Sequence, residues 1–197
     1  MYKLIGSKNS RAFRVLWLLE ELGLEYAHED VPPHHAKVLA ANPAGKIPVF
    51  VDGDLIIRDS NAIMAYLADK HEAVTFPAGT PKRALQDSYT YFLLDEFDAA
   101  LWVAARHSFV LPKAQRIPEV KDSLKWEFSK SQKGLVDRWG DGPYLMGDTF
   151  TIADILLAQS LNWAKTAKFD ITEDRLLAYH DEMKKRPAYK RALSRKS

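Results

Sequence analysis

Residues 42–50, NPAGKIPVF, are followed nine residues later by Asp59-Ser60 at the start of an amphipathic run. The pattern predicts a loop, an Ile47-Pro48 step and a strand, then a turn at residues 52–54, a second strand and a helix start. Because proline has no N–H, Pro48 cannot donate to the sheet ladder. The backbone N–H and C=O of Ile47 can bind an extended peptide. A helix start adds N–H groups and a positive dipole, which favour a carboxylate. The stretch therefore indicates a site for a small acidic peptide.

A small α/β arrangement is predicted around this stretch. Tyr2–Ile5 has the pattern of a short strand, and residues 11–22 have helical apolar spacing with Gly23 as the stop. Residues 25–31 favour a second strand, and residues 61–71 favour a helix. Residues 34–41 are predicted to form a short helix or an irregular loop. The order strand, helix, strand, this segment, two strands, helix suits a thioredoxin-like α/β N-terminal domain, which we expect over residues 1–72.

The pattern changes after residue 72. Residues 73–81 contain two prolines, a glycine and two threonines, and predict an interdomain linker. Strand signals then nearly vanish, and we predict an all-α C-terminal helical domain over residues 82–197. Thr151 and Asp154 in this part have the spacing of a capping box, which indicates a role in folding. The segments with helical spacing are 84–107, 118–139, 152–165 and 173–185, with a short last helix after Pro187.

Composition narrows the class of protein. The 197 residues are 47% hydrophobic and 27% charged, with a net charge of +2, so nucleic acid is not expected as a partner. The absence of Cys excludes disulfides, thiolate metal sites and catalytic cysteine. With no secretory leader pattern and no apolar run of about 18 residues, we expect a cytoplasmic protein that does not bind membranes.

A metal site is not expected either. His28, His34 and His35 are close in sequence, but adjacent histidines point in different directions. No acidic partner stands at a useful helical spacing from them. The sequence therefore predicts a protein that functions without metal.

The landmarks, in this order and spacing, resemble those of the cytosolic glutathione transferase family. The resemblance covers essentially the whole chain and favours a bacterial-type, serine-type-like member that lacks the catalytic tyrosine. It implies the two-domain glutathione transferase fold, glutathione as co-substrate and a homodimer. The matching segments are residues 1–5, SRAFRVLWLLEELG at 10–23, NPAGKIPVF at 42–50, DGDLIIRDSNAIMAYLADK at 52–70 and FTIAD at 150–154.

The resemblance implies how glutathione would bind. Asp59 would take the ammonium of the γ-glutamyl group, and Ser60, as helix N-cap, would take its carboxylate. The Ile47-Pro48 peptide bond would be cis, with the Ile47 backbone pairing with the cysteinyl part of glutathione in the manner of an added strand. Lys46 stands where the family often has a polar side chain that reaches the ligand.

The catalytic residue is expected in the turn at residues 6–11. Its task is to hold the glutathione sulfur as thiolate, against a thiol pKa of about 8.5. Tyr2 opens the first strand too early for this role. Aligned without gaps on Gly23, the serine of serine-type relatives falls near Asn9. We favour Ser10 because a serine there would cap the helix. The alternatives are Asn9 as an amide donor, Arg11 as a cation, and Ser7.

The resemblance also implies a pocket for the second substrate. The family forms it near the end of the first long helix of the second domain, where this chain has Trp102, Arg106, His107 and Phe109. The predicted function is conjugation of the glutathione thiolate to small hydrophobic electrophiles. The alternatives are a glutathione-dependent isomerase or peroxidase on the same fold, or a non-catalytic interaction module like the transferase-like domains of elongation factor gamma subunits.

Extra apolar residues support the homodimer. Met64 and Tyr66 lie on the helix after Asp59-Ser60, and Tyr91, Leu93 and Leu94 lie on the helix from Lys82. These residues extend beyond one clean apolar stripe. Apolar surface of this kind needs a partner, and a two-fold patch is the commonest solution.

Overall fold

The computed structural model describes residues 1–195, and its chain divides into two compact units. The first unit comprises Met1–Arg83 together with the segment that begins at Lys184, and the second comprises Ala84–Met183. Residues 196–197, which the predicted second domain includes, lie outside the described residues. The boundaries predicted at 72 and 82 stay a prediction, and the contacts group the last helix with the first unit.

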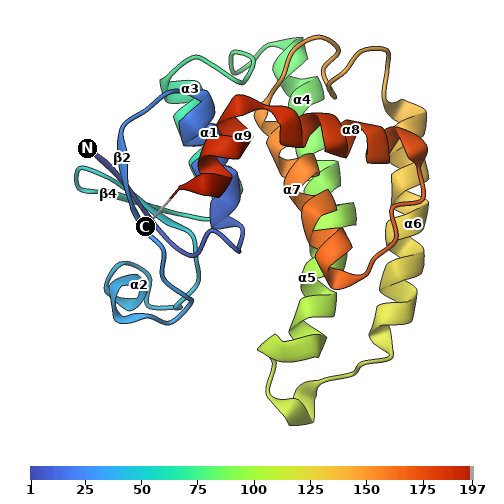
Figure 1. The fold of residues 1–197 in the computed structure, drawn as a ribbon, viewed down its shortest axis with the longest axis horizontal. Helices are drawn as coiled ribbons and strands as arrows, with labels where there is room; N and C mark the ends of the chain where they lie inside the picture. Colours follow the sequence, from blue (N-terminus) through green and yellow to red (C-terminus); the bar gives the residue numbers. More distant parts are fainter. Residues whose placement is uncertain (196–197) are drawn as a thin grey trace. The chain divides into compact units, whose positions relative to one another are not determined.

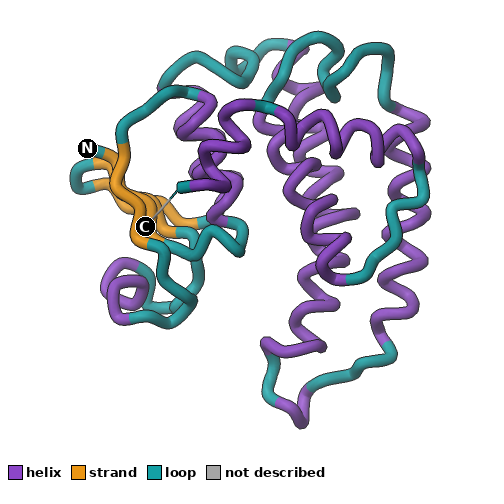
Figure 2. Tube along the Cα trace, in the orientation of Figure 1, coloured by secondary structure: helices purple, strands orange, loops and turns teal. Residues whose placement is uncertain are grey.

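The first unit is built on a four-stranded sheet with the order β2-β1-β3-β4 (Figures 1 and 2). Strands β1 and β2 are parallel, while β1–β3 and β3–β4 are antiparallel. This topology confirms the predicted thioredoxin-like domain. The elements are β1 (Tyr2–Ile5), α1 (Ala12–Glu21), β2 (Tyr26–Glu29), α2 (Ala36–Ala41), β3 (Val49–Asp52), β4 (Leu55–Arg58) and α3 (Ser60–Lys70).

The two faces of the sheet are covered by different helices. Ile5 pairs with Val49 in the ladder, and both pack against Val38 of α2. Their neighbours Leu4 and Phe50 are also paired and fully buried. Because successive strand residues point to opposite faces, Leu4 and Phe50 face the other side of the sheet. Helix α1 packs against β1 and α3.

Helix α1 is buried on every side. The sequence predicts one apolar stripe, but all residues from Ala12 to Leu19 are buried. The reason is the last helix, α9 (Pro187–Ser194), which returns to the first unit and packs on α1. The Tyr189 ring lies edge-on to Phe13 and to Trp17, with centroids 5.2 and 5.0 Å apart. Helix α9 therefore completes the core of the first unit.

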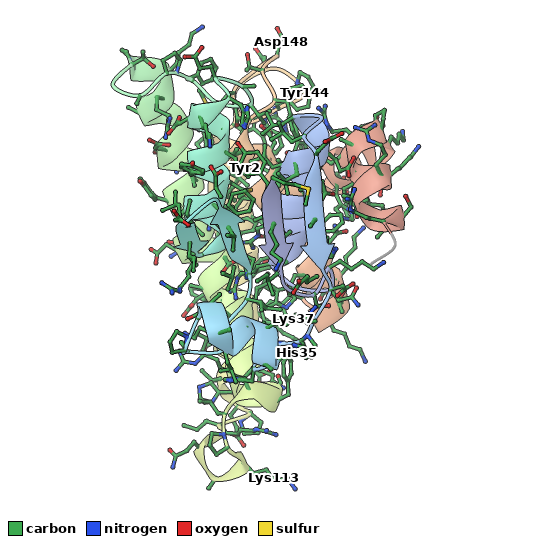
Figure 3. The ribbon with its side chains drawn as sticks, turned by 90° about the vertical axis from the view of Figure 1, so that its left-hand side faces the viewer. Tyr2, His35, Lys37, Lys113, Tyr144 and Asp148 are labelled. Carbon is green, nitrogen blue, oxygen red and sulfur yellow. The ribbon has the colours of Figure 1, made fainter. Side chains whose placement is uncertain are left out.

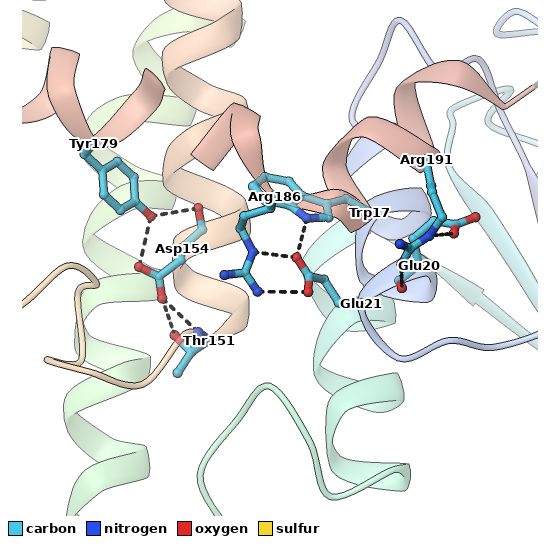
Figure 4. A network of polar contacts seen from close by, with 8 residues as sticks. All are labelled: Trp17, Glu20, Glu21, Thr151, Asp154, Tyr179, Arg186 and Arg191. Atoms are coloured by element: carbon cyan, nitrogen blue, oxygen red, sulfur yellow. Dashed lines mark hydrogen bonds and ion pairs between the residues drawn. The ribbon is translucent and has the colours of Figure 1, made fainter. Parts of the chain in front are cut away.

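Ion pairs join α9 to the end of α1 (Figure 4). Arg186 donates to both carboxylate oxygens of Glu21 at 2.7 and 2.9 Å, and the Trp17 indole donates to the same carboxylate at 2.8 Å. Arg191 and Arg195 bind Glu20 at 2.9 and 3.2 Å. Burial alone would raise the pKa of Glu20, but these hydrogen bonds and charges outweigh it and lower the pKa.

The second unit is helical, as predicted. Its core includes phenylalanine rings packed edge-to-face, with Phe128 lying 4.9 Å from Phe97 and 5.6 Å from Phe169 between ring centroids. The elements are α4 (Pro81–Phe92), a π-helical segment η1 (Leu93–Asp98), α5 (Ala99–Ala105), a second π-helical segment η2 (Arg106–Val110), a 3-10 turn η3 (Lys113–Gln115), α6 (Val120–Arg138), α7 (Ile152–Ala167) and α8 (Asp174–Lys185).

The predicted capping box at the start of α7 is present. The buried Asp154 carboxylate accepts from the Thr151 N–H at 2.8 Å and the Tyr179 hydroxyl at 2.9 Å (Figure 4). It also accepts from the Leu145 N–H at 2.9 Å. Burial raises the pKa of Asp154 to about 6, against the opposing effect of these hydrogen bonds. Within residues 1–195, no helix is long and apolar enough to cross a bilayer.

Candidate functional site

The turn after β1 contains the four candidates for thiol activation. Ser10 lies one residue before the N-cap of α1, which is Arg11 and makes no side-chain cap hydrogen bond. The Ser10 hydroxyl donates to the Ser7 carbonyl at 2.6 Å and accepts from the Ala12 N–H at 3.1 Å. The single hydroxyl proton of Ser10 is therefore used inside the turn.

Ser7 differs from Ser10 in this respect. Its Oγ accepts from the N–H of the exposed Asn9 at 3.4 Å. Within the described residues, neither the Ser7 hydroxyl nor the Ser7 N–H donates a hydrogen bond. Ser7 is half-buried at the point where β1 has ended and α1 has not yet begun. It presents two unused donors on one residue, which the sequence does not reveal.

The Ile47–Pro48 peptide bond is cis, as the resemblance implies. The loop before it is held by Asn42, whose side chain donates to the Lys46 carbonyl at 2.8 Å and accepts from the Ala44 N–H at 3.3 Å. Sequence reasoning missed Asn42, although Asn before Pro-Ala-Gly is a recognisable turn signal. Lys46 is exposed, and the described residues contain no hydrogen-bond partner for the Ile47 N–H.

The start of α3 is capped by Asp59, and the prediction that Ser60 is the N-cap was wrong by one residue. Asp59 has φ +78° and its carboxylate accepts from the N–H groups of Asn61 and Ala62 at 2.8 and 3.1 Å. Ser60 is the first residue of the helix and is almost fully buried. Two of the helix N–H groups expected to bind a ligand carboxylate are therefore used by Asp59 itself.

Two contacts bring these segments together within the first unit. Gly6 has φ +143°, and a Cβ atom there would lie 2.9 Å from the Ile47 Cβ, so only glycine allows this approach. Arg14, fully buried on α1, donates from Nη1 to the Ser60 hydroxyl at 3.3 Å. The turn after β1 thus contacts the Ile47 step, and α1 contacts the start of α3.

The three histidines considered for metal binding have structural contacts. His28 binds the Gly6 carbonyl, and His34 packs on Gly45, where a Cβ atom would lie 2.0 Å from the His34 ring. His35 accepts from the Lys37 N–H at the start of α2 (Figure 3). Residues 1–195 contain no group of three His, Cys, Asp or Glu side chains that could hold a metal ion.

The residues expected to form the electrophile pocket lie in the second unit. Trp102 is on α5 and half-buried, Arg106 opens the segment η2 and is exposed, and Phe109 is 69% exposed. The backbone near them is held by Arg116, which donates to the carbonyls of Phe109 and Leu111 at 3.0 and 2.7 Å. Their assignment to the electrophile pocket stays a prediction.

The comparisons with known proteins agree with this fold. Residues 10–70 match the model of the glutathione S-transferase N-terminal domain, and residues 133–193 match that of the C-terminal domain. The glutathione S-transferase-like protein tpcF of Aspergillus fumigatus is 32% identical over 72% of this chain and 69% of that protein.

Solved structures are similar over nearly the whole chain. A glutathione transferase from Methylococcus capsulatus is 26% identical with a TM-score of 0.85, covering 98% of this chain and 97% of that one. The glutathione transferase URE2P8 of Phanerochaete chrysosporium, solved with oxidized glutathione, is 25% identical with a TM-score of 0.81, over 98% and 93% of the two chains. On the matches of both domains and of these relatives, the chain belongs to the glutathione transferase family.

Proposed function

We propose that this protein is a glutathione transferase that conjugates the thiolate of glutathione to small hydrophobic electrophiles. The proposal rests on two contacts within the first unit: Gly6, the neighbour of Ser7 in the chain, closely approaches Ile47, and Arg14 of α1 donates to Ser60 at the start of α3. These are the segments that the family resemblance assigns to glutathione. The names of the relatives support the same activity.

In this proposal glutathione lies along the Ile47–Pro48 step as an added strand. The N–H of Ile47 would bind the cysteinyl part, with Lys46 reaching toward the ligand from the exposed side of the loop. Ser60 would bind the γ-glutamyl carboxylate through its hydroxyl, which already accepts from Arg14 and so has its proton to give. Asp59 would bind the ammonium through the carboxylate oxygen not used in capping α3.

Ser7 is the residue that we propose to stabilise the thiolate, in preference to Ser10. Ser7 would donate from its hydroxyl and its N–H to the sulfur, and the nearby start of α1 would add a favourable potential. Ser10 would first have to give up its 2.6 Å bond to the Ser7 carbonyl. Asn9 and Arg11 remain alternatives that the variants below separate, and the serine-type assignment is part of this proposal.

The chemical step is a nucleophilic attack. The thiolate forms a C–S bond with an electrophilic carbon, and the leaving group departs with the bonding electrons, for example as halide from an aryl halide. Stabilising the thiolate at neutral pH raises the fraction of the reactive form. We propose Trp102, Arg106 and Phe109 as the residues that contact the electrophile.

The homodimer is proposed on a revised set of residues. Met64 and Leu93 are buried within their own units and leave no surface for a partner, so that part of the prediction was wrong. Exposed apolar side chains remain at Leu85 and Tyr91 on α4 and at Ile56 on the edge strand β4. These support a two-fold interface between copies of this chain. A cytoplasmic location stays part of the proposal.

Retention on immobilised glutathione, followed by turnover with aryl halides, isothiocyanates and hydroperoxides, tests this function. Elution by free glutathione and conjugation of an aryl halide are the expected results. Reduction of hydroperoxides without conjugation would favour the peroxidase alternative. Failure to bind glutathione would contradict the proposal and favour an interaction module.

A further inference from the structure

Gly6 is held on both sides of its backbone by the end of β2. Its N–H donates to the Glu29 carbonyl at 3.0 Å, and its carbonyl oxygen lies 2.9 Å from the Nε2 atom of His28. The missing side chain of Gly6 lets the turn approach Ile47 and Ala12, which a Cβ atom would meet at 2.9 and 3.3 Å. The position of this peptide is therefore fixed from three directions.

The contact determines which nitrogen of His28 carries a proton. A carbonyl oxygen only accepts, so the Nε2 atom must be the donor. The other ring nitrogen, Nδ1, is buried and has no hydrogen-bond partner among the described residues. His28 thus makes its one hydrogen bond to Gly6, although a buried ring nitrogen without a partner is costly. A residue chosen only for strand packing would not need this polar ring.

The Gly6 carbonyl belongs to the same peptide group as the Ser7 N–H. A hydrogen bond accepted at a carbonyl polarises its peptide and strengthens the N–H on the other end as a donor. We propose that His28 is a positioning residue for the reaction, which orients and polarises the Gly6–Ser7 peptide so that Ser7 stabilises the glutathione thiolate. This inference rests on the proposed function and on the assignment of Ser7.

Other charged groups near the turn make contacts that do not involve His28. The Asp30 carboxylate accepts from the Lys8 N–H at 3.3 Å, and the Lys8 ammonium donates to the Arg195 carbonyl. Glu29 binds Lys3 at 3.1 Å and lies on the opposite face of β2 from His28. A difference in thiol titration between His28 variants therefore reports on the His28–Gly6 bond.

The test compares His28→Phe, which has a ring but no donor, with His28→Gln, whose side-chain amide can still donate to Gly6. His28→Leu serves with the Gln variant if the Phe variant does not fold. His71→Phe is the matched control, because the His71 ring makes a comparable single hydrogen bond, 2.9 Å to the Tyr2 hydroxyl, within the same unit. Three quantities are measured: the absorbance of the bound glutathione thiolate against pH, the glutathione Kd, and kcat/KM for the electrophile against pH at saturating glutathione.

We expect His28→Phe to raise the apparent pKa of the bound thiol by about one unit and to lower kcat/KM about tenfold on the acidic limb. At a pH below the pKa of the bound thiol, where the thiol form binds in both proteins, the glutathione Kd should change less than about threefold, because binding uses other residues. His28→Gln should recover most of the shift, and His71→Phe should match the wild type.

A wild-type thiol titration in both donor-free variants would overturn the inference, as would equal losses in the Gln and donor-free variants. Parallel losses in Kd and kcat/KM would assign His28 to binding or packing and also overturn it. The thiolate absorbance does not require turnover, so this outcome is distinct from failure of the proposed function. If the wild-type protein does not bind glutathione, the proposed function and this inference both fail.

Discussion

One hydroxyl proton distinguishes the two serines of the turn after β1. The Ser10 proton is given to the Ser7 carbonyl, whereas the Ser7 proton has no acceptor in residues 1–195. A thiolate needs a donor that is not already engaged, because breaking an existing hydrogen bond offsets the gain from making a new one. This difference in hydrogen bonding is why we propose Ser7 for the thiolate, although Ser10 stands nearer the helix.

Ser7→Ala should raise the apparent pKa of bound glutathione sulfur and lower kcat about tenfold to a thousandfold near neutral pH, the effect of losing one donor to a developing anion. Glutathione affinity measured below the pKa of the bound thiol should stay close to wild type. The pH profile of kcat and the absorbance of the bound thiolate against pH measure these two changes.

Ser10→Ala is the control in the same turn. It should lower the stability of the turn and leave the thiol titration near wild type. If Ser10→Ala, Asn9→Ala or Arg11→Ala instead produces the raised thiol pKa, the assignment moves to that residue.

Ser60→Ala should weaken glutathione binding by about 1–3 kcal/mol, since it removes a hydrogen bond to a charged group. Calorimetric titration with glutathione measures the change. Ser123→Ala is a suitable control, because the Ser123 hydroxyl donates only to the Val120 carbonyl on the exposed side of α6. A folded Ser60→Ala protein with unchanged affinity would contradict the role of Ser60.

Part of the candidate site's geometry, the cis Ile47–Pro48 bond and the helix start near Asp59, could be predicted, and the rest depends on three-dimensional contacts. Ile47-Pro48 and Asp59-Ser60 stand out because proline and a helix start are local signals. The N-cap is Asp59 and not Ser60 because Asp59 adopts a backbone conformation with φ +78°, which a sequence does not specify. His28 and Arg14 form hydrogen bonds with partners 22 and 46 residues away, which local patterns do not reveal.

At the scale of elements, α9 and α1 form the least local part of the first unit. The four strands and the helices α1 and α3 could be predicted from periodicity and turn residues, whereas α2 could not be told from an irregular loop. The docking of α9 on α1 could not be predicted, because the apolar stripe of α9 could pack on any helix and its arginines could equally face solvent. The ion pairs to Glu20 and Glu21 fix the choice by adding directional bonds to the apolar contact.

Glu21→Gln should lower the free energy of unfolding by about 1.5–3 kcal/mol, because the bidentate pair with Arg186 is largely shielded from water. Urea unfolding at constant pH measures the loss. Arg186→Gln should cost a similar amount, and the double variant should cost less than the sum of the two.

The exposed pair Lys133–Asp137 on α6 gives the matched comparison for Glu21. Asp137→Asn removes a surface pair within one helix and should cost less than about 0.5 kcal/mol. Equal losses of unfolding free energy in Glu21→Gln and Asp137→Asn would show that the Glu21–Arg186 pair stabilises the protein no more than an exposed pair does.

The whole molecule is expected to be a dimer in solution. Light scattering at micromolar concentration should give a mass of about twice the 22.4 kDa of one chain. Tyr91 is 66% exposed on α4, and Tyr91→Glu should shift the mass toward a single chain, because a buried unpaired carboxylate opposes association.

Trp126 is a matched control for Tyr91. It is 65% exposed on α6, which the proposed interface does not include. Trp126→Glu should leave the mass unchanged. A wild-type mass near that of one chain would refute the dimer.

The return of α9 to the first unit also bears on the order of events during protein synthesis. The sheet, α1 and α3 leave the ribosome early, but residues 187–194 emerge only after the whole helical unit. Until then the Phe13 and Trp17 face of α1 lacks the cover of Tyr189. We therefore expect the amino-terminal unit to stay open to chaperones and proteases throughout translation, and to close only when the far end of the polypeptide arrives.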